Sequence, residues 1–138
     1  MDLRQFHEDH AYLREHALQL GRLISESGPD PECTARLLDA LRVMRARLAL
    51  HLAIEDRFLY PQVEAAEPEE QLGDTRALRD ALGHLDQSLA ELVERFDDVI
   101  AIGREPDQFR RHLGGLLKAL QQRMDQEEAQ LFPIAAEL

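Results

Sequence analysis

The sequence predicts an all-α fold, an antiparallel up-down-up-down four-helix bundle in which residues 1–138 form a single domain. First, the composition favours helices, because Leu, Ala, Glu, Arg and Gln dominate while the aromatic residues that strands favour make up only 5%. Second, Gly, Pro and acidic residues concentrate at 25–31, 66–74 and 103–107, which divides the chain into four helical stretches. Third, each stretch repeats apolar residues every three or four positions, as helices packed in a bundle do.

Each predicted helix has a recognisable start. Asp2 begins a capping-box pattern at the first helix, and Asp30 followed by Pro31 suits the N-cap and first turn of the second. Asp74 is expected to cap the third helix, and Pro106 to open the fourth. Because the connections are short, consecutive helices should run antiparallel.

Charge and hydropathy narrow the classes of partner. The formal net charge is -11 and no run of Lys or Arg forms a patch, so nucleic acid is not an expected partner. Residues 1–10 lack the apolar core of a secretory signal, and no stretch approaches the ~20 apolar residues of a membrane span. The single cysteine, Cys33, has no internal disulfide partner. We expect a cytoplasmic protein that does not contact a membrane.

One phrase occurs twice in the chain, at residues 51–61 and 123–133. In each copy a glutamate, Glu55 or Glu127, follows four residues after a nitrogen-bearing side chain and precedes a proline by six residues. Both copies end in Leu, an aromatic residue and Pro. The first residue of the phrase differs, because it is histidine in the first copy and arginine in the second.

Polar side chains interrupt the apolar stripes at positions where a bundle normally has leucine. These side chains are His10, His51, Glu55, His84, Arg123 and Glu127. Burying a neutral polar group without a partner costs about 1–3 kcal/mol, and burying a charge costs more. Counting residues from the turns places all of them at a similar depth, so the sequence predicts one shared site.

This pattern resembles the hemerythrin-like, or HHE cation-binding, family over nearly the whole chain. The resemblance rests on a histidine in the first and third helices, His-x-x-x-Glu with Leu-aromatic-Pro in the second, and an altered copy in the fourth. It implies two iron ions with histidine ligands and bridging carboxylates, in a site that binds or senses oxygen or iron or handles related small molecules. The metal ligands that it implies are His10, His51, Glu55, His84 and Glu127.

Arg123 departs from the family pattern, since it lies where the fourth-helix histidine is expected. A protonated guanidinium has no lone pair for a metal and brings positive charge into the site. We therefore expect a degenerate di-iron site that holds at most one iron. His16 is a second candidate for the first-helix ligand, although His10 fits the apolar stripe and the depth better.

Three functions stay open at this point. The first is a binding or sensing module for oxygen, iron or redox state, with a metal ion and dioxygen or another small molecule as partners. The second is a metal-free structural or interaction bundle in which Arg123 bridges Glu55 and Glu127 by a salt bridge. The third is a di-iron protein that handles oxygen or peroxide. An enzyme is not the favoured interpretation, because no nucleophile with its base is evident. A protein partner or homodimer also stays open, since apolar residues such as Leu50 can face either core or solvent.

Overall fold

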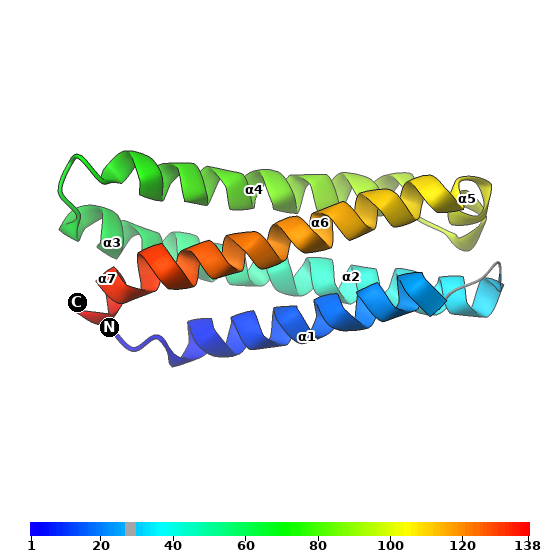
Figure 1. Cartoon of the computed structure of the whole chain (residues 1–138), viewed down its shortest axis with the longest axis horizontal. Helices are drawn as coiled ribbons and strands as arrows, with labels where there is room; N and C mark the ends of the chain where they lie inside the picture. The colour runs from blue at the N-terminus through cyan, green and yellow to red at the C-terminus, as the bar shows by residue number, and fades with distance from the viewer. Residues whose placement is uncertain (27–29) are drawn as a thin grey trace.

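Four antiparallel helical rods form the structure, a computed structural model that describes residues 1–26 and 30–138 (Figure 1). Its elements are α1 (Arg4–Glu26), α2 (Pro31–Ile54), η1 (Glu55–Leu59), α3 (Tyr60–Ala66), α4 (Leu72–Arg95), α5 (Val99–Arg104), α6 (Pro106–Gln126), η2 (Glu127–Leu131) and α7 (Phe132–Ala136). The elements η1 and η2 are π-helical turns that continue directly from α2 and α6. Both chain ends lie at the same end of the bundle. The described residues contain no strand, and the predicted all-α, up-down-up-down bundle is confirmed.

The helix starts at Asp30 and Pro106 agree with the prediction, and the start near Asp74 does not. Asp30 is the N-cap of α2, where its side chain accepts a hydrogen bond of 3.0 Å from the backbone N–H of Glu32. Pro106 is the first residue of α6. Asp74 is not a cap, because α4 already begins at Leu72 and Asp74 lies within its first turn. There its negative charge still favours the helix, since backbone N–H groups at a helix N-terminus carry partial positive charge.

The helix α5 and the two π-helical turns were not predicted from the sequence, and one predicted break is only partly described. The chain leaves α4 at Phe96 and forms the short helix α5, whose N-cap Asp98 accepts from the backbone N–H of Ala101 at 2.7 Å. The predicted break at 25–31 includes residues 27–29, which lie outside the described residues.

The core consists of two apolar clusters. The larger cluster includes fully buried leucines from every long helix, among them Leu20, Leu41, Leu89 and Leu113. The smaller cluster lies where the two chain ends meet and consists of Leu3, Phe6, Leu59, Tyr60, Val63, Leu131, Phe132 and Ala135. On three of the four rods, buried polar side chains lie between the members of the larger cluster and those of the smaller cluster. The chain therefore encloses a polar layer between two apolar ones.

The two π-helical turns occupy equivalent places in the repeated phrase. The backbone N–H of Tyr60 bonds to the carbonyl of Glu55, and that of Phe132 bonds to the carbonyl of Glu127, so each turn is one residue wider than an α-turn. A proline follows each turn, at 61 and 133, and proline lacks an N–H and clashes with the carbonyl four residues earlier. The extra residue directs two consecutive side chains of each rod, such as Leu59 and Tyr60, into the core.

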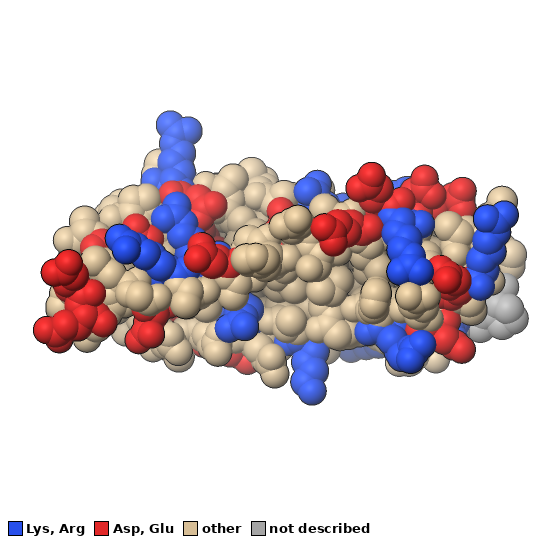
Figure 2. Space-filling view, turned by 90° about the horizontal axis from the view of Figure 1, so that it is seen from above, with Lys and Arg blue, Asp and Glu red and all other residues tan. Residues whose placement is uncertain are grey.

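The surface carries charges of both signs. On the face drawn in Figure 2, acidic and basic side chains lie beside one another near both ends of the molecule, and the middle is mostly uncharged. Ion pairs such as Arg95 with Glu105 at 2.9 Å link neighbouring elements, although exposed pairs contribute little stability. Within the described part of the chain, every helix is too short or too polar to cross a lipid bilayer.

Replacing Leu89 with alanine should test the packing of the larger cluster. Leu89 is fully buried, so Leu89→Ala leaves a cavity and should lower the free energy of unfolding by about 2–5 kcal/mol. The matched control is Leu18→Ala, which changes a side chain that is 56% exposed on α1 and should cost less than about 0.5 kcal/mol. Urea unfolding followed by circular dichroism measures both, and equal losses would contradict the assigned core.

Candidate metal centre

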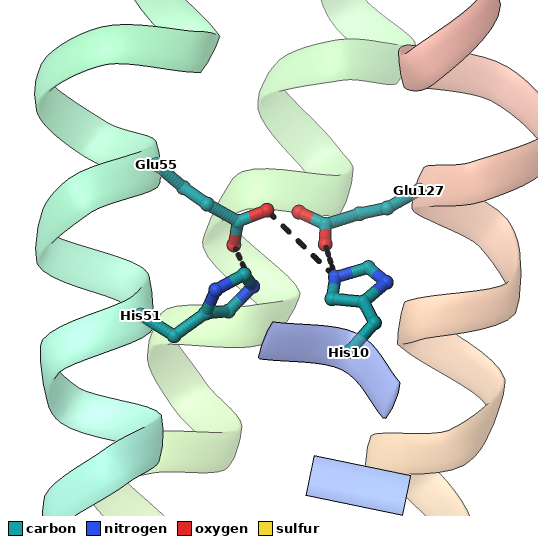
Figure 3. Close-up of side chains that lie close together, drawn as sticks. All are labelled: His10, His51, Glu55 and Glu127. Carbon is teal, nitrogen blue, oxygen red and sulfur yellow. Dashed lines mark hydrogen bonds and ion pairs between the residues drawn. The ribbon is translucent and has the colours of Figure 1, made fainter. Parts of the chain in front are cut away.

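Four polar side chains meet in the layer between the apolar clusters. They are His10 on α1, His51 near the end of α2, Glu55 at the start of η1 and Glu127 at the start of η2 (Figure 3). We call these residues the His/Glu cluster. Three of them are fully buried and His51 is 4% exposed. Each offers one nitrogen or oxygen atom such that all of these atoms lie within 4.8 Å of one another. A single ion can therefore contact all four.

In the His/Glu cluster, each histidine places one ring nitrogen close to a carboxyl oxygen of one glutamate. The Nε2 atom of His51 lies 3.0 Å from Oε1 of Glu55, one turn further along the same rod. The Nε2 atom of His10 lies 3.0 Å from Oε1 of Glu127 and 4.0 Å from Oε2 of Glu55. Since His10 is on α1 and Glu127 on η2, the second pair joins two different rods.

Two acidic residues outside the His/Glu cluster contact the outer nitrogens of its histidines. The Nδ1 atom of His51 is hydrogen-bonded to Oδ2 of Asp9 at 3.0 Å, and Nδ1 of His10 lies 3.6 Å from Oε1 of Glu128. Glu128 is itself held by Arg14. A carboxylate that accepts the Nδ1 proton leaves the Nε2 lone pair for a metal and fixes the ring orientation. For His51 this lone pair is directed towards Glu55 and the centre of the cluster.

Tyr60 completes the surroundings of Glu127. Its hydroxyl donates a hydrogen bond of 2.7 Å to Oε2 of Glu127, and its side chain is 1% exposed. Burial and the nearby carboxylates of Glu127 and Glu55 raise the pKa of the Tyr60 hydroxyl, so it stays a neutral donor. The two oxygens of Glu127 therefore have different partners, His10 and Tyr60.

The two buried carboxyl groups have opposite pKa shifts. Burial, followed by the negative charge of Glu127, raises the pKa of Glu55 far above its ordinary value. Burial also raises the pKa of Glu127, but interactions with His10, Glu55 and Tyr60 favour its charged form and bring the pKa below the ordinary value. Without a cation, the cluster therefore holds one carboxylate and one protonated carboxyl group.

The hydrogen bonds of the cluster test whether a metal fits. His51 Nε2 and both carboxyl oxygens of Glu55 are buried and form no well-aligned hydrogen bond, although Nε2 lies 3.0 Å from Oε1. Such atoms cost free energy unless something pairs with them, and a divalent cation accepts lone pairs from all three. Two imidazoles with two carboxyl groups suit first-row metals such as iron, manganese, cobalt and zinc. The donor set fits a metal ion.

The structure does not bring His84 into the His/Glu cluster. His84 is exposed on α4, and its Nδ1 lies 2.8 Å from the backbone carbonyl of Asp80. The neighbouring positions that α4 buries are leucines, Leu82 and Leu85. His16, the alternative first-helix ligand, has its ring 4.3 Å from that of Tyr12 and also lies outside the cluster.

Arg123 does not form the salt bridge of the metal-free alternative. It is partly buried on α6, and its Nη1 donates to Oε1 of Gln126 at 2.7 Å. Among the described residues, no ion pair joins Arg123 to Glu55 or Glu127. The expected bridge is therefore wrong, since a long side chain that starts in the polar layer can still place its charged group outside it.

The site also includes three residues that were not predicted from the sequence, Asp9, Glu128 and Tyr60. Asp9 directly precedes His10, and Glu128 directly follows Glu127, so both border positions that had been identified. Tyr60 is the aromatic residue of the Leu-aromatic-Pro ending, and only the π-helical turn directs it inward. The proline after Tyr60 was the available signal for that turn.

Comparison with known proteins agrees with this geometry. A family model, the hemerythrin HHE cation-binding domain, matches residues 1–135. The chain belongs to this family. No curated protein and no solved structure matches it. The resemblance inferred from the sequence is confirmed, and the His/Glu cluster is a group able to hold a metal within an HHE cation-binding domain.

The raised pKa of Glu55 predicts how the stability of the metal-free HHE protein depends on pH. The folded chain keeps a proton that the unfolded chain releases above about pH 4.5, so stability should fall as pH rises through the window above that value. The slope from this one group is at most about 1.4 kcal/mol per pH unit. The lowered pKa of Glu127 acts only below this window.

Glu55→Gln should remove this loss of stability. Urea unfolding in the presence of a chelator, at several values between about pH 5 and pH 8, should show a smaller decline for Glu55→Gln than for the wild type. Glu15→Gln, at an exposed position of α1, should leave the decline unchanged. Parallel curves for wild type and Glu55→Gln would disprove the prediction.

Proposed function

We propose that this HHE protein binds a single iron ion through His10, His51, Glu55 and Glu127, and that it serves as a binding or sensing module for dioxygen or another small redox-active molecule. The observation that carries the proposal is the set of buried, unpartnered atoms on His51 and Glu55 beside the His10 and Glu127 pair. A cation that contacts all four residues pairs these atoms and offsets the carboxylate charge.

The positions of the donors support one ion rather than two. The described residues contain one group of at least three clustered His, Cys, Asp or Glu side chains, and it has four members. A second ion would need donors from α4 and α6, where His84 is exposed and Arg123 contacts Gln126. The di-iron alternative therefore has less support, since the described residues offer no second group of this kind.

The donor chemistry supports iron with a small-molecule ligand. Two imidazoles and two carboxyl groups resemble the mixed His and carboxylate sets of non-haem iron sites, which keep coordination positions open for an exogenous ligand. Bound iron would supply redox chemistry and an affinity for dioxygen or a related ligand. The chain itself keeps His51 oriented through Asp9 and holds Glu127 through Tyr60. These contacts fix the donors in place, which supports a binding role.

The metal-free interaction bundle has less support. Its physical basis was a guanidinium that neutralises Glu55 and Glu127, and Arg123 does not contact them. Without that charge, the buried carboxyl groups need protonation or a cation to be tolerated.

Metal analysis tests the proposal directly. Protein purified without oxygen from iron-replete cells should contain about one iron per chain, measured by mass spectrometry of the metal. His51→Ala removes a donor and should abolish stoichiometric binding. His84→Ala is the matched control, because His84 lies outside the cluster, and it should keep one iron. Loss of iron in His84→Ala but not in His51→Ala would overturn the ligand assignment, and iron-free wild type would overturn the proposal.

Restoring a histidine at position 123 should not create a second metal position. Arg123→His gives α6 an imidazole, but α4 still contributes no donor to the polar layer. The expected iron content therefore stays at about one per chain. Two irons per chain in Arg123→His would show that the arginine alone blocks a second site.

Asp9→Asn weakens the hydrogen bond that orients His51, and it should lower iron affinity by about 10- to 100-fold.

A further inference from the structure

The buried position of the His/Glu cluster raises the question of how a cation reaches it. Three of its residues have no exposed surface, and His51 alone retains 4%. A groove of about 270 Å³ between α1 and α2 has His51 in its wall. The other residues of this groove used below are Glu8, Asp9 and Tyr12 from α1 and Arg47 and Leu50 from α2.

We propose that this α1/α2 groove is the route by which a hydrated divalent cation enters and leaves the His/Glu cluster. The inference rests on the proposed metal binding and adds the path to it. A second groove of about 330 Å³, between α2 and α4, is lined by Tyr60 and His84 but by none of the four donors. Because His51 lies in the wall of the α1/α2 groove, this groove is the favoured route for the cation.

The size of the groove fits a hydrated ion. Six waters at roughly 30 Å³ each occupy roughly 180 Å³, which is less than the groove volume. Hydrated cations shed their waters stepwise as protein oxygens replace them. The groove can thus hold the ion with its water shell before the ion contacts His51.

The charges of the groove favour a cation. Glu8 is exposed at its wall, and the side chain of Asp9 is 21% exposed and hydrogen-bonded to His51 Nδ1 at 3.0 Å. Asp9 therefore faces the groove and contacts the cluster at the same time. Arg47 brings one opposing charge, but its guanidinium lies over the ring of Tyr12, 4.6 Å from the centroid. Two carboxylates against one guanidinium leave a negative potential that raises the local concentration of cations.

Filling the groove should slow exchange without changing affinity. Leu50 is 55% exposed at the groove wall, so Leu50→Trp adds bulk there while the core stays intact. Val43→Trp, at a position of α2 that is 47% exposed and not part of the groove wall, is the matched control. Cobalt(II) serves as the probe, because its visible absorption changes when protein ligands bind it. Uptake is followed by stopped flow, release by adding a chelator, and the Kd by competition.

We expect Leu50→Trp to slow both uptake and release by roughly tenfold, which corresponds to a barrier higher by about 1.4 kcal/mol. The Kd should not change, and Val43→Trp should exchange cobalt at the wild-type rate.

The charge of the groove is tested separately. Glu8→Gln should slow uptake roughly two- to threefold at low salt and not at high salt, while Glu15→Gln should have no effect. Equal rates in Leu50→Trp and Val43→Trp would overturn the route. So would slowing by Gln87→Trp, in the α2/α4 groove, without slowing by Leu50→Trp. Wild type that binds no cobalt would overturn the proposed function itself, a different result from unchanged rates.

Discussion

The structure depends on two carboxyl groups and two imidazoles buried together between apolar layers. One oxygen of Glu55 and one of Glu127 lie within 4.8 Å of each other. Two unit charges at roughly 4 Å repel by roughly 4 kcal/mol at an effective dielectric constant of 20, so both groups cannot be charged there without compensation. In the metal-free chain, the pKa values of the two groups move in opposite directions, which keeps a proton on Glu55. A cation would offer stronger compensation, because it would accept lone pairs from the atoms of Glu55 and His51 that form no well-aligned hydrogen bond.

The repeated phrase explains how the chain builds this layer. Each copy starts a π-helical turn at its glutamate, and the extra residue lets the glutamate and the following Leu-aromatic pair all face inward. The copies differ in which histidine pairs with the glutamate. Glu55 pairs with His51 on its own rod, whereas Glu127 pairs with His10 from α1. Because Arg123 contacts Gln126 and not Glu127, the second half of the layer depends on the first helix, and the two halves of the site are not equivalent.

For the polar side chains predicted to share one site, the position along the bundle axis is easier to predict from the sequence than the side of the helix that the side chain faces. Counting from the turns, together with the family resemblance, identified His10, His51, Glu55 and Glu127 before the fold was known, because residue number sets the height along a helix. Direction is less certain, since one residue turns a helical side chain by about 100°. His84 adjoins the buried Leu85 but faces solvent. The guanidinium of Arg123 ends several bonds from its backbone, so its height in the helix did not determine its partner.

Tyr60 limits what Glu127 can do as a ligand. A carboxylate that bridges two cations uses both of its oxygens, and the two oxygens of Glu127 already face different partners. Oε1 lies 3.0 Å from His10, and Oε2 accepts a hydrogen bond of 2.7 Å from the Tyr60 hydroxyl. The buried phenol stays protonated because charge on it would lie beside Glu127 in a poorly solvated layer. A proton of Tyr60 therefore satisfies the oxygen that would otherwise be free for a second ion. The exposed position of His84, the contact of Arg123 with Gln126 and the hydrogen bond from Tyr60 all support the proposal of a site for one cation.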